Sequence, residues 1–189
     1  MMTGTNMTAM ADAPAIDEQE SDVLLLWVLV WSELVAFGLL IGAFLVMSAF
    51  QPEQFALARH HLSPGLAALN TVILLTSGWQ AAVAARRTAS AQQVRRSLIA
   101  AALLGFVFLV VKLFEYAGEI RYAGEETFSR FFELYFIITG FHLLHVVFGA
   151  LVMLLIAWRP ARGNVALITT LWHAIDLVWI VMFPIIYLA

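Results

Sequence analysis

Three pairs of ionisable residues interrupt apolar segments of the chain, and the two members of each pair are three positions apart. They are His142 and His145, His173 and Asp176, and Lys112 and Glu115. Residues at this spacing project from the same face of a helix. If these segments are helices, each pair therefore presents two polar side chains to one neighbouring surface.

The chemistry open to these pairs is hydrogen bonding, metal or haem ligation, or the conduction of protons or ions. Polar side chains within membrane spans face the bundle interior and pair with one another, which favours interhelical hydrogen bonding. Histidine and aspartate also ligate zinc or iron, and one or two histidines can ligate haem. The sequence contains no cysteine, which excludes disulfides and thiolate ligands.

Glu33 is the one charged residue between Val23 and Phe50. At a rise of about 1.5 Å per residue it lies roughly 15 Å into this segment, near the middle of a hydrocarbon core about 30 Å thick. A charged carboxylate at this depth costs roughly 2.5–3.5 kcal/mol on insertion scales, so we expect Glu33 to be protonated or paired. It is a candidate proton carrier, although a relay needs further acceptors and this segment offers only Ser32 beside it.

Five long apolar segments must position these residues, and each is close to the length of about 20 residues that a helix needs to cross a bilayer. The expected spans are 23–50, 64–85, 97–118, 134–158 and 164–188. Of the 189 residues, 62% are hydrophobic and 12% charged, against roughly 45–50% and about 25% in soluble domains. Because backbone groups in lipid must be paired within each segment, we predict an all-α integral membrane protein, a five-transmembrane-helix bundle.

The predicted organisation is a short arm followed by one membrane domain. Residues 1–22 contain five acidic residues and no Lys or Arg, and we expect them to form a disordered, solvated arm. Residues 23–189 are expected to form the membrane domain. Loops rich in basic residues remain on the cytoplasmic side. With five spans, one side carries six arginines and the other three: Arg86, Arg87, Arg95, Arg96, Arg159 and Arg162 against Arg59, Arg121 and Arg130. We therefore predict a cytoplasmic amino terminus and an external carboxyl terminus.

Aromatic residues lie mostly toward the ends of the expected spans. Because their amphipathic rings favour the membrane interface, we expect interfacial positions for this set: Trp27, Trp31, Trp158, Trp172, Tyr122, Tyr135 and Tyr187. Trp79 and Trp179 lie deeper in their spans, and we expect them to be packing residues.

Four stretches of the sequence resemble successive signatures of one family of membrane subunits. They are WSELVAFG (31–38), LFEYAG (113–118), YFIITGFHLLHVVFG (135–149) and LWHAIDLVWIVMFPIIYL (171–188). The most specific are the Thr-Gly-Phe-His-x-x-His and Trp-His-x-x-Asp-x-x-Trp segments. They resemble subunit III of the haem-copper oxidases in type, order and separation, and the resemblance extends from about residue 24 to residue 188.

The chain is shorter than the long forms of this family, which have two further helices at the amino terminus. It is similar to the five-span forms found in quinol oxidases and in the NorE-type accessory proteins linked to nitric oxide reductase. The stretches LNTVILLTSGW (69–79) and KLFEYAG (112–118) look closest to the NorE type.

The resemblance implies a non-catalytic subunit of a respiratory terminal oxidase or nitric oxide reductase in a bacterial plasma membrane. In this family subunit III carries no haem or copper, flanks the catalytic subunit and sustains its proton uptake and turnover. The resemblance thus implies no cofactor or metal in this chain, haem with copper or iron in the partner subunit, and room for bound phospholipid. The alternative is an independent membrane protein that binds metal or haem, or carries ions, through its His and Asp residues.

The resemblance also gives the polar residues a role. Glu33 matches a buried carboxylate that reacts with carbodiimide in the family. Four residues match family signature positions and are expected to form, with Glu33, one buried polar cluster linking the last two spans: His142, His145, His173 and Asp176. Within it we expect His145 to meet Asp176. Lys112 and Glu115 are expected to form a second polar pair.

Overall fold

Five helices are long and apolar enough to cross a membrane, as the apolar segments predict. The computed structural model describes residues 18–125 and 127–188, and within these residues all regular structure is helical. The candidate spans are Leu26–Phe50, Pro64–Ala84, Ala91–Glu119, Ser129–Trp158 and Arg162–Leu188. The predicted fold class is therefore confirmed. The side of the membrane on which each terminus lies stays a prediction.

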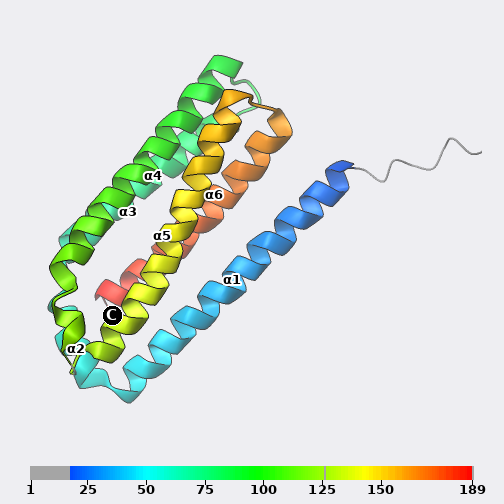
Figure 1. Ribbon diagram of the computed structural model, residues 1–189. Coiled ribbons are helices and arrows are strands. Elements are labelled where there is room, and N and C mark those ends of the chain that lie inside the picture. Colours follow the sequence, from blue (N-terminus) through cyan, green and yellow to red (C-terminus); the bar gives the residue numbers. More distant parts are fainter. Residues whose placement is uncertain (1–17, 126, 189) are drawn as a thin grey trace, which may run out of the picture.

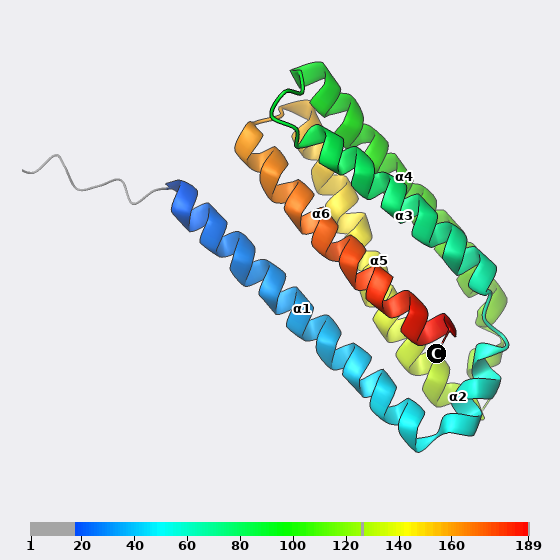
Figure 2. The ribbon, with the colours of Figure 1, turned by 180° about the vertical axis from the view of Figure 1, so that it is seen from behind.

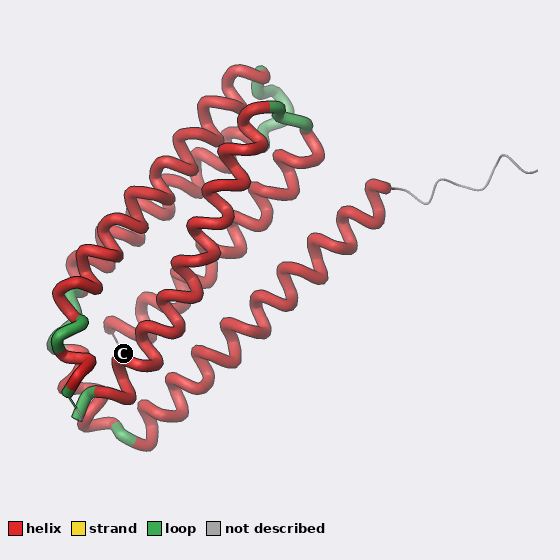
Figure 3. Tube along the Cα trace, in the orientation of Figure 1, coloured by secondary structure: helices red, strands yellow, loops and turns green. Residues whose placement is uncertain are grey.

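The helices follow one another with short connections (Figures 1 and 3). In chain order they are α1 (Glu18–Phe50), α2 (Pro52–Arg59), α3 (Pro64–Ala84), α4 (Ala91–Glu119), the 3-10 turn η1 (Tyr122–Gly124), α5 (Ser129–Trp158), α6 (Arg162–Phe183) and the π-helical turn η2 (Pro184–Leu188). Residues 18–22 of the predicted arm belong to α1, and residues 1–17 lie outside the described residues. The short helix α2 lies between the first and second predicted spans, where the sequence analysis predicted no helix.

Local sequence explains where several helices begin. Proline stands at the start of α2 and α3, where its missing N–H costs no hydrogen bond and its fixed φ suits a helix. Ser90 caps α4, because its hydroxyl accepts a hydrogen bond of 3.2 Å from the backbone N–H of Gln93. These residues mark where each connection ends and the next helix begins.

The spans pack as a group of four with α1 at one side. α3 lies against α4 and α6, and α5 lies against α4 and α6. In Figures 1 and 2, α1 runs beside α5 and α6, and its amino-terminal end stands away from the other helices. Only 17% of the most apolar stretch of α1 is buried, against 50% for the last span. The protein therefore leaves most of α1 facing its surroundings.

Trp172 of α6 is fully buried against α4 and α5. Glycines of two other helices make room for its indole ring. A Cβ atom at Gly105 of α4 or at Gly149 of α5 would lie 2.9 Å from ring carbons of Trp172. Close approach at small residues is the usual way in which membrane helices pack. Trp172 thus joins α4, α5 and α6, whereas the sequence analysis expected it at the interface.

Two hydrogen bonds fasten α3 to its neighbours. The Ser77 hydroxyl donates to the carbonyl oxygen of Ala101 over 2.8 Å, which joins α3 to α4. The indole N–H of Trp179 donates to the Thr71 hydroxyl over 3.0 Å, which joins α6 to α3. Trp179 is 1% exposed, as expected for a packing residue, but Trp79 is 60% exposed and faces outward.

Candidate functional site

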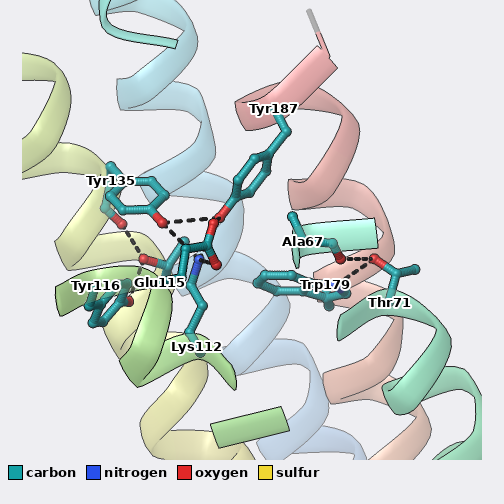
Figure 4. A network of polar contacts seen from close by, with 9 residues as sticks. Ala67, Thr71, Lys112, Glu115, Tyr116, Tyr135, Trp179 and Tyr187 are labelled. Carbon is teal, nitrogen blue, oxygen red and sulfur yellow. Dashed lines mark hydrogen bonds and ion pairs between the residues drawn. The ribbon is translucent and has the colours of Figure 1, made fainter. Parts of the chain in front are cut away.

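Lys112 and Glu115 lie at the centre of a buried hydrogen-bonded cluster (Figure 4). The Lys112 ammonium lies 3.0 Å from a carboxylate oxygen of Glu115 and donates to the Tyr135 hydroxyl over 2.8 Å. It also donates to the Tyr187 hydroxyl. Tyr187 in turn donates to the second oxygen of Glu115 over 2.8 Å. We call these four residues the lysine cluster.

The lysine cluster satisfies its charges from within. An ammonium group has three hydrogen-bond donors, and Lys112 has three acceptors within reach. Both charged side chains are 0% exposed, and the Lys112 Nζ atom lies 4.8 Å from the centre of the Tyr135 ring. The cluster therefore ties α4, α5 and η2 together and offers no exposed group to a ligand.

The sequence analysis expected two members of the lysine cluster, Tyr135 and Tyr187, at the membrane interface. They are 0% and 8% exposed. Their positions near span ends suggested an interface, but both rings point inward to Lys112. The signal that could have found them is the lysine itself, because a buried ammonium requires several acceptors from neighbouring helices.

Glu33 and His145 form a second polar pair, between α1 and α5. The Nε2 atom of His145 lies 2.9 Å from a carboxylate oxygen of Glu33, and the side chains are 19% and 25% exposed. The other ring nitrogen, Nδ1, lies 2.7 Å from the carbonyl oxygen of Phe141. A carbonyl can only accept, so Nδ1 carries a hydrogen.

The contact between Glu33 and His145 is close without meeting the geometry of a hydrogen bond. The Glu33 oxygen that lies 2.9 Å from Nε2 has no hydrogen-bond partner among the described residues. The pair is thus a close polar contact between α1 and α5 at the edge of an otherwise apolar groove.

The pair lines a groove beside α1. A cavity of about 410 Å³ opens there, and its other lining side chains are apolar: Leu29, Leu144, Val147, Phe148, Leu151, Leu171 and Ile175. A second apolar cavity of about 340 Å³ continues along α1 between α5 and α6. Glu33 and His145 are thus open to the side of the bundle, whereas the lysine cluster is closed.

His142 and Asp176 lie apart from the Glu33–His145 pair. His142 is fully buried, with its ring 5.3 Å from Trp179 and 5.8 Å from Phe108, and neither ring nitrogen has a hydrogen-bond partner among the described residues. Asp176 faces α3, where a Cβ atom at Gly78 would clash with the carboxylate oxygen Oδ2. The same oxygen lies 3.8 Å from Nδ1 of His173, and the other oxygen, Oδ1, has no hydrogen-bond partner among the described residues. The structure thus pairs His145 with Glu33, not with Asp176 as expected.

The predicted cluster is therefore divided between separate places in the bundle. The reason is geometric: a spacing of three residues fixes a common helix face but does not say which helix lies opposite. Among the described residues no three His, Asp or Glu side chains converge in a way that could hold a metal ion.

The fold and these sites define a multi-pass α-helical membrane protein that keeps a buried ion pair in its interior. The family model for cytochrome c oxidase subunit III matches residues 24–189. Similar proteins include cytochrome c oxidase subunit 3 of Corynebacterium diphtheriae, 34% identical over 138 residues, which covers 68% of this chain and 67% of the relative. That of Thermostichus vulcanus is 30% identical over 193 residues, covering 96% and 94%.

The chain belongs to the cytochrome c oxidase subunit III family. Its five apolar helices and its bacterial relatives make it a multi-pass protein of the bacterial plasma membrane, with a place in respiratory electron transport. The resemblance seen in the sequence is confirmed at the level of the family. The nearer resemblance to the NorE type stays a prediction.

Proposed function

We propose that this chain is the non-catalytic subunit III of an oxygen-reducing haem-copper oxidase, in which it supports assembly, stability and proton uptake of the catalytic subunit. Membership of the family and relatives named cytochrome c oxidase subunit 3 support this proposal. Haem and copper then belong to the partner subunit. In this proposal the membrane domain, residues 23–189, is the unit that associates with the partner.

The observation that carries the proton-related part of the proposal is the Glu33–His145 pair. It brings a carboxyl and an imidazole within 2.9 Å of each other, and it lines a lateral groove. Imidazole and carboxyl groups are the side chains that most often transfer protons in proteins, which is why we assign the pair to proton uptake. The lysine cluster has a different task, which is to hold the ends of α4, α5 and η2 in place.

Co-purification and turnover test the proposal. A tagged chain is purified in mild detergent from its native membrane, and we expect a haem-copper catalytic subunit to accompany it. Membranes that lack the chain should contain less assembled oxidase, and the remainder should lose activity faster during sustained turnover. Unchanged assembly and turnover without the chain would disprove the proposed role.

A single substitution separates proton handling from assembly. Glu33→Gln keeps the shape of the side chain but removes the titratable carboxyl, so we expect normal co-purification and slower proton uptake at high turnover. Glu53→Gln, in the exposed part of α2, is the control and should change neither. If proton uptake is equal in the two variants, the Glu33–His145 pair does not have the proposed role.

A nitric oxide reductase accessory protein is the second candidate. The stretches 69–79 and 112–118, which look closest to the NorE type, favour it. The identity of the catalytic subunit that co-purifies decides between the two, because the two partners reduce different gases. An independent metal-binding protein or ion carrier is not favoured by membership of this family.

A further inference from the structure

Glu119, the last residue of α4, is a buried carboxyl group that none of the sites described above uses. It is 2% exposed, although its neighbours Gly118 and Ile120 are both exposed. Neither of its carboxylate oxygens has a hydrogen-bond partner among the described residues. Because an isolated charge is costly away from water, a buried carboxyl without a partner takes up a proton or attracts a cation.

Glu119 lies beside the lysine cluster, on the face of α4 that also carries Lys112 and Glu115. Positions 112, 115 and 119 are three and four residues apart, so their side chains form one row along the helix. The titratable groups that act on Glu119 come from α4, α5 and η2: Lys112, Glu115, Tyr116, Tyr135 and Tyr187. Lysine is the only one of these side chains that carries a positive charge.

Lys112 cannot balance Glu119 as well as Glu115. Its three N–H donors are already directed to Glu115, Tyr135 and Tyr187. If both carboxyls were ionised, two negative charges would therefore lie beside one positive charge in a site closed to water. The backbone carbonyl groups at the carboxyl-terminal end of α4 make the potential at Glu119 still more negative. One positive charge is missing at this end of the cluster.

A proton supplies the missing charge better than a metal ion does. Metal ions that prefer oxygen ligands take about six of them. Within the described ranges, His, Asp and Glu side chains do not gather in threes that could hold a metal, and the hydroxyls of Tyr135 and Tyr187 are already bonded to Lys112. A proton needs only one oxygen of the Glu119 carboxyl.

Two tyrosine hydroxyls connect Glu119 to the carboxyl of Glu115. Tyr187 donates to Glu115 over 2.8 Å, and the hydroxyls of Tyr135 and Tyr187 are 3.0 Å apart, as Figure 4 shows. Tyr135 also lies next to Glu119, without the geometry of a hydrogen bond. Protons pass between groups about 2.6–3.2 Å apart. Of the three steps between the carboxyls, only the one from Glu119 to Tyr135 lacks a formed bond.

We propose that Glu119 and Glu115 form a proton-binding site that holds one proton between them. With the proton on Glu119, Lys112 pairs with an ionised Glu115, as the structure has it. Transfer breaks the O–H bond of Glu119 and forms one on Glu115, while each tyrosine hydroxyl receives one hydrogen and passes one on. The net charge stays the same. The site is separate from the Glu33–His145 pair and does not depend on which catalytic subunit is the partner.

Infrared spectroscopy of the purified full-length chain in neutral buffer tests the proposal. A protonated carboxyl has a carbonyl band of its own, which shifts in deuterium oxide. All samples carry Glu33→Gln, so that Glu33 adds nothing to this band. Glu119→Gln should remove one carboxyl equivalent. Glu115→Gln should remove the same equivalent, because Glu119 is then the only carboxyl left to balance Lys112 and must ionise.

Glu133→Gln is the matched control, since this glutamate is 61% exposed, and it should leave the band unchanged. A full band in Glu119→Gln would overturn the proposal. A full band in Glu115→Gln would show that the two carboxyls do not share a proton, which overturns it equally. A band that appears only when choline replaces sodium and potassium in the buffer would assign the site to a metal cation instead.

Thermal unfolding in detergent provides a second measurement that does not rest on the band. Because Glu119 is neutral in the proposed site, Glu119→Gln should unfold close to the temperature of the wild-type chain. Lys112→Met removes the cation from the cluster and should unfold at a much lower temperature. A loss in Glu119→Gln as large as that in Lys112→Met, or a failure to fold, would show that Glu119 is a charged partner of the lysine and would overturn the proposal.

Discussion

At the scale of single residues, the lysine cluster shows how the protein keeps a buried charge pair. Removing one partner of a buried ion pair costs about 3–5 kcal/mol, whereas replacing both by apolar residues of similar size is often neutral or stabilising. We therefore predict that Lys112→Met strongly destabilises the chain and that Lys112→Met with Glu115→Leu restores most of its stability. Tyr135 and Tyr187 keep a partner in the double variant, because their hydroxyls are 3.0 Å apart. Thermal unfolding in detergent is the measurement.

The exposed pair Arg130 and Glu133 provides the control for this prediction. It has the same spacing as Lys112 and Glu115, but its side chains are 67% and 61% exposed and its closest atoms are 3.7 Å apart. Arg130→Met should cost less than about 1 kcal/mol. A double variant of the lysine cluster that is no more stable than Lys112→Met would contradict our account.

The sequence predicted that Lys112 and Glu115 share a face, and the structure places them 3.0 Å apart. It did not predict that Tyr135 and Tyr187 contact this pair. The partners of a buried charge come from other helices, and residue spacing within one helix does not reveal how those helices are rotated about their axes. The same limit explains why we expected Asp176 opposite His145 and the structure has Glu33 there.

The Glu33–His145 contact predicts energetic coupling. His145→Leu leaves the Glu33 carboxyl without its partner, so adding Glu33→Leu should recover part of the lost stability, with a coupling of about 0.5–3 kcal/mol. His145→Leu and Asp176→Leu should add within about 0.5 kcal/mol, since the two side chains share no partner. Both cycles are measured by thermal unfolding. Coupling between His145 and Asp176 alone would refute the pairing.

Carboxyl labelling gives a second residue-scale prediction. A hydrophobic carbodiimide attacks a protonated carboxyl that it can reach from lipid. Glu33 is 25% exposed and lines the lateral groove, so it should be modified, while Glu115, which is 0% exposed within the lysine cluster, should not. Peptide mass mapping after labelling checks both sites in one sample. Preferential labelling of Glu115 would contradict the structure.

At the scale of helices, the contact surfaces depend on small residues around Trp172. A methyl group at Gly149 would lie 2.9 Å from the buried ring, so we predict that Gly149→Ala costs about 1–3 kcal/mol, as overpacking usually does. Gly38→Ala is the control, because nothing lies within 4 Å of a Cβ atom there and alanine favours a helix by roughly 0.5–1 kcal/mol. Unfolding midpoints of the two variants should therefore move in opposite directions.

The helices themselves were the most predictable part of the molecule. All five spans follow from apolar length, because lipid leaves the backbone no partner outside the helix. Their ends were less predictable: α4 begins at Ala91 and not at 97, and α5 begins at Ser129 and not at 134. A helix forms its own backbone hydrogen bonds in water as well as in lipid. It therefore continues through polar residues at which an apolar segment of the sequence ends.

At the scale of the whole molecule, the arginines determine the predicted orientation. The loops that join α3 to α4 and α5 to α6 lie at one end of the bundle, and with the turns after them they carry six arginines and no acidic residue. Basic loops stay in the cytoplasm, so this end should be inside and the end that contains α2 outside.

Single cysteines can test this orientation, because the chain has none of its own. Thr88→Cys lies between α3 and α4, and His60→Cys follows α2; both positions are exposed. In intact spheroplasts a membrane-impermeant maleimide should label the cysteine at 60 and not the one at 88, and after permeabilisation it should label both. The reverse pattern would invert the orientation.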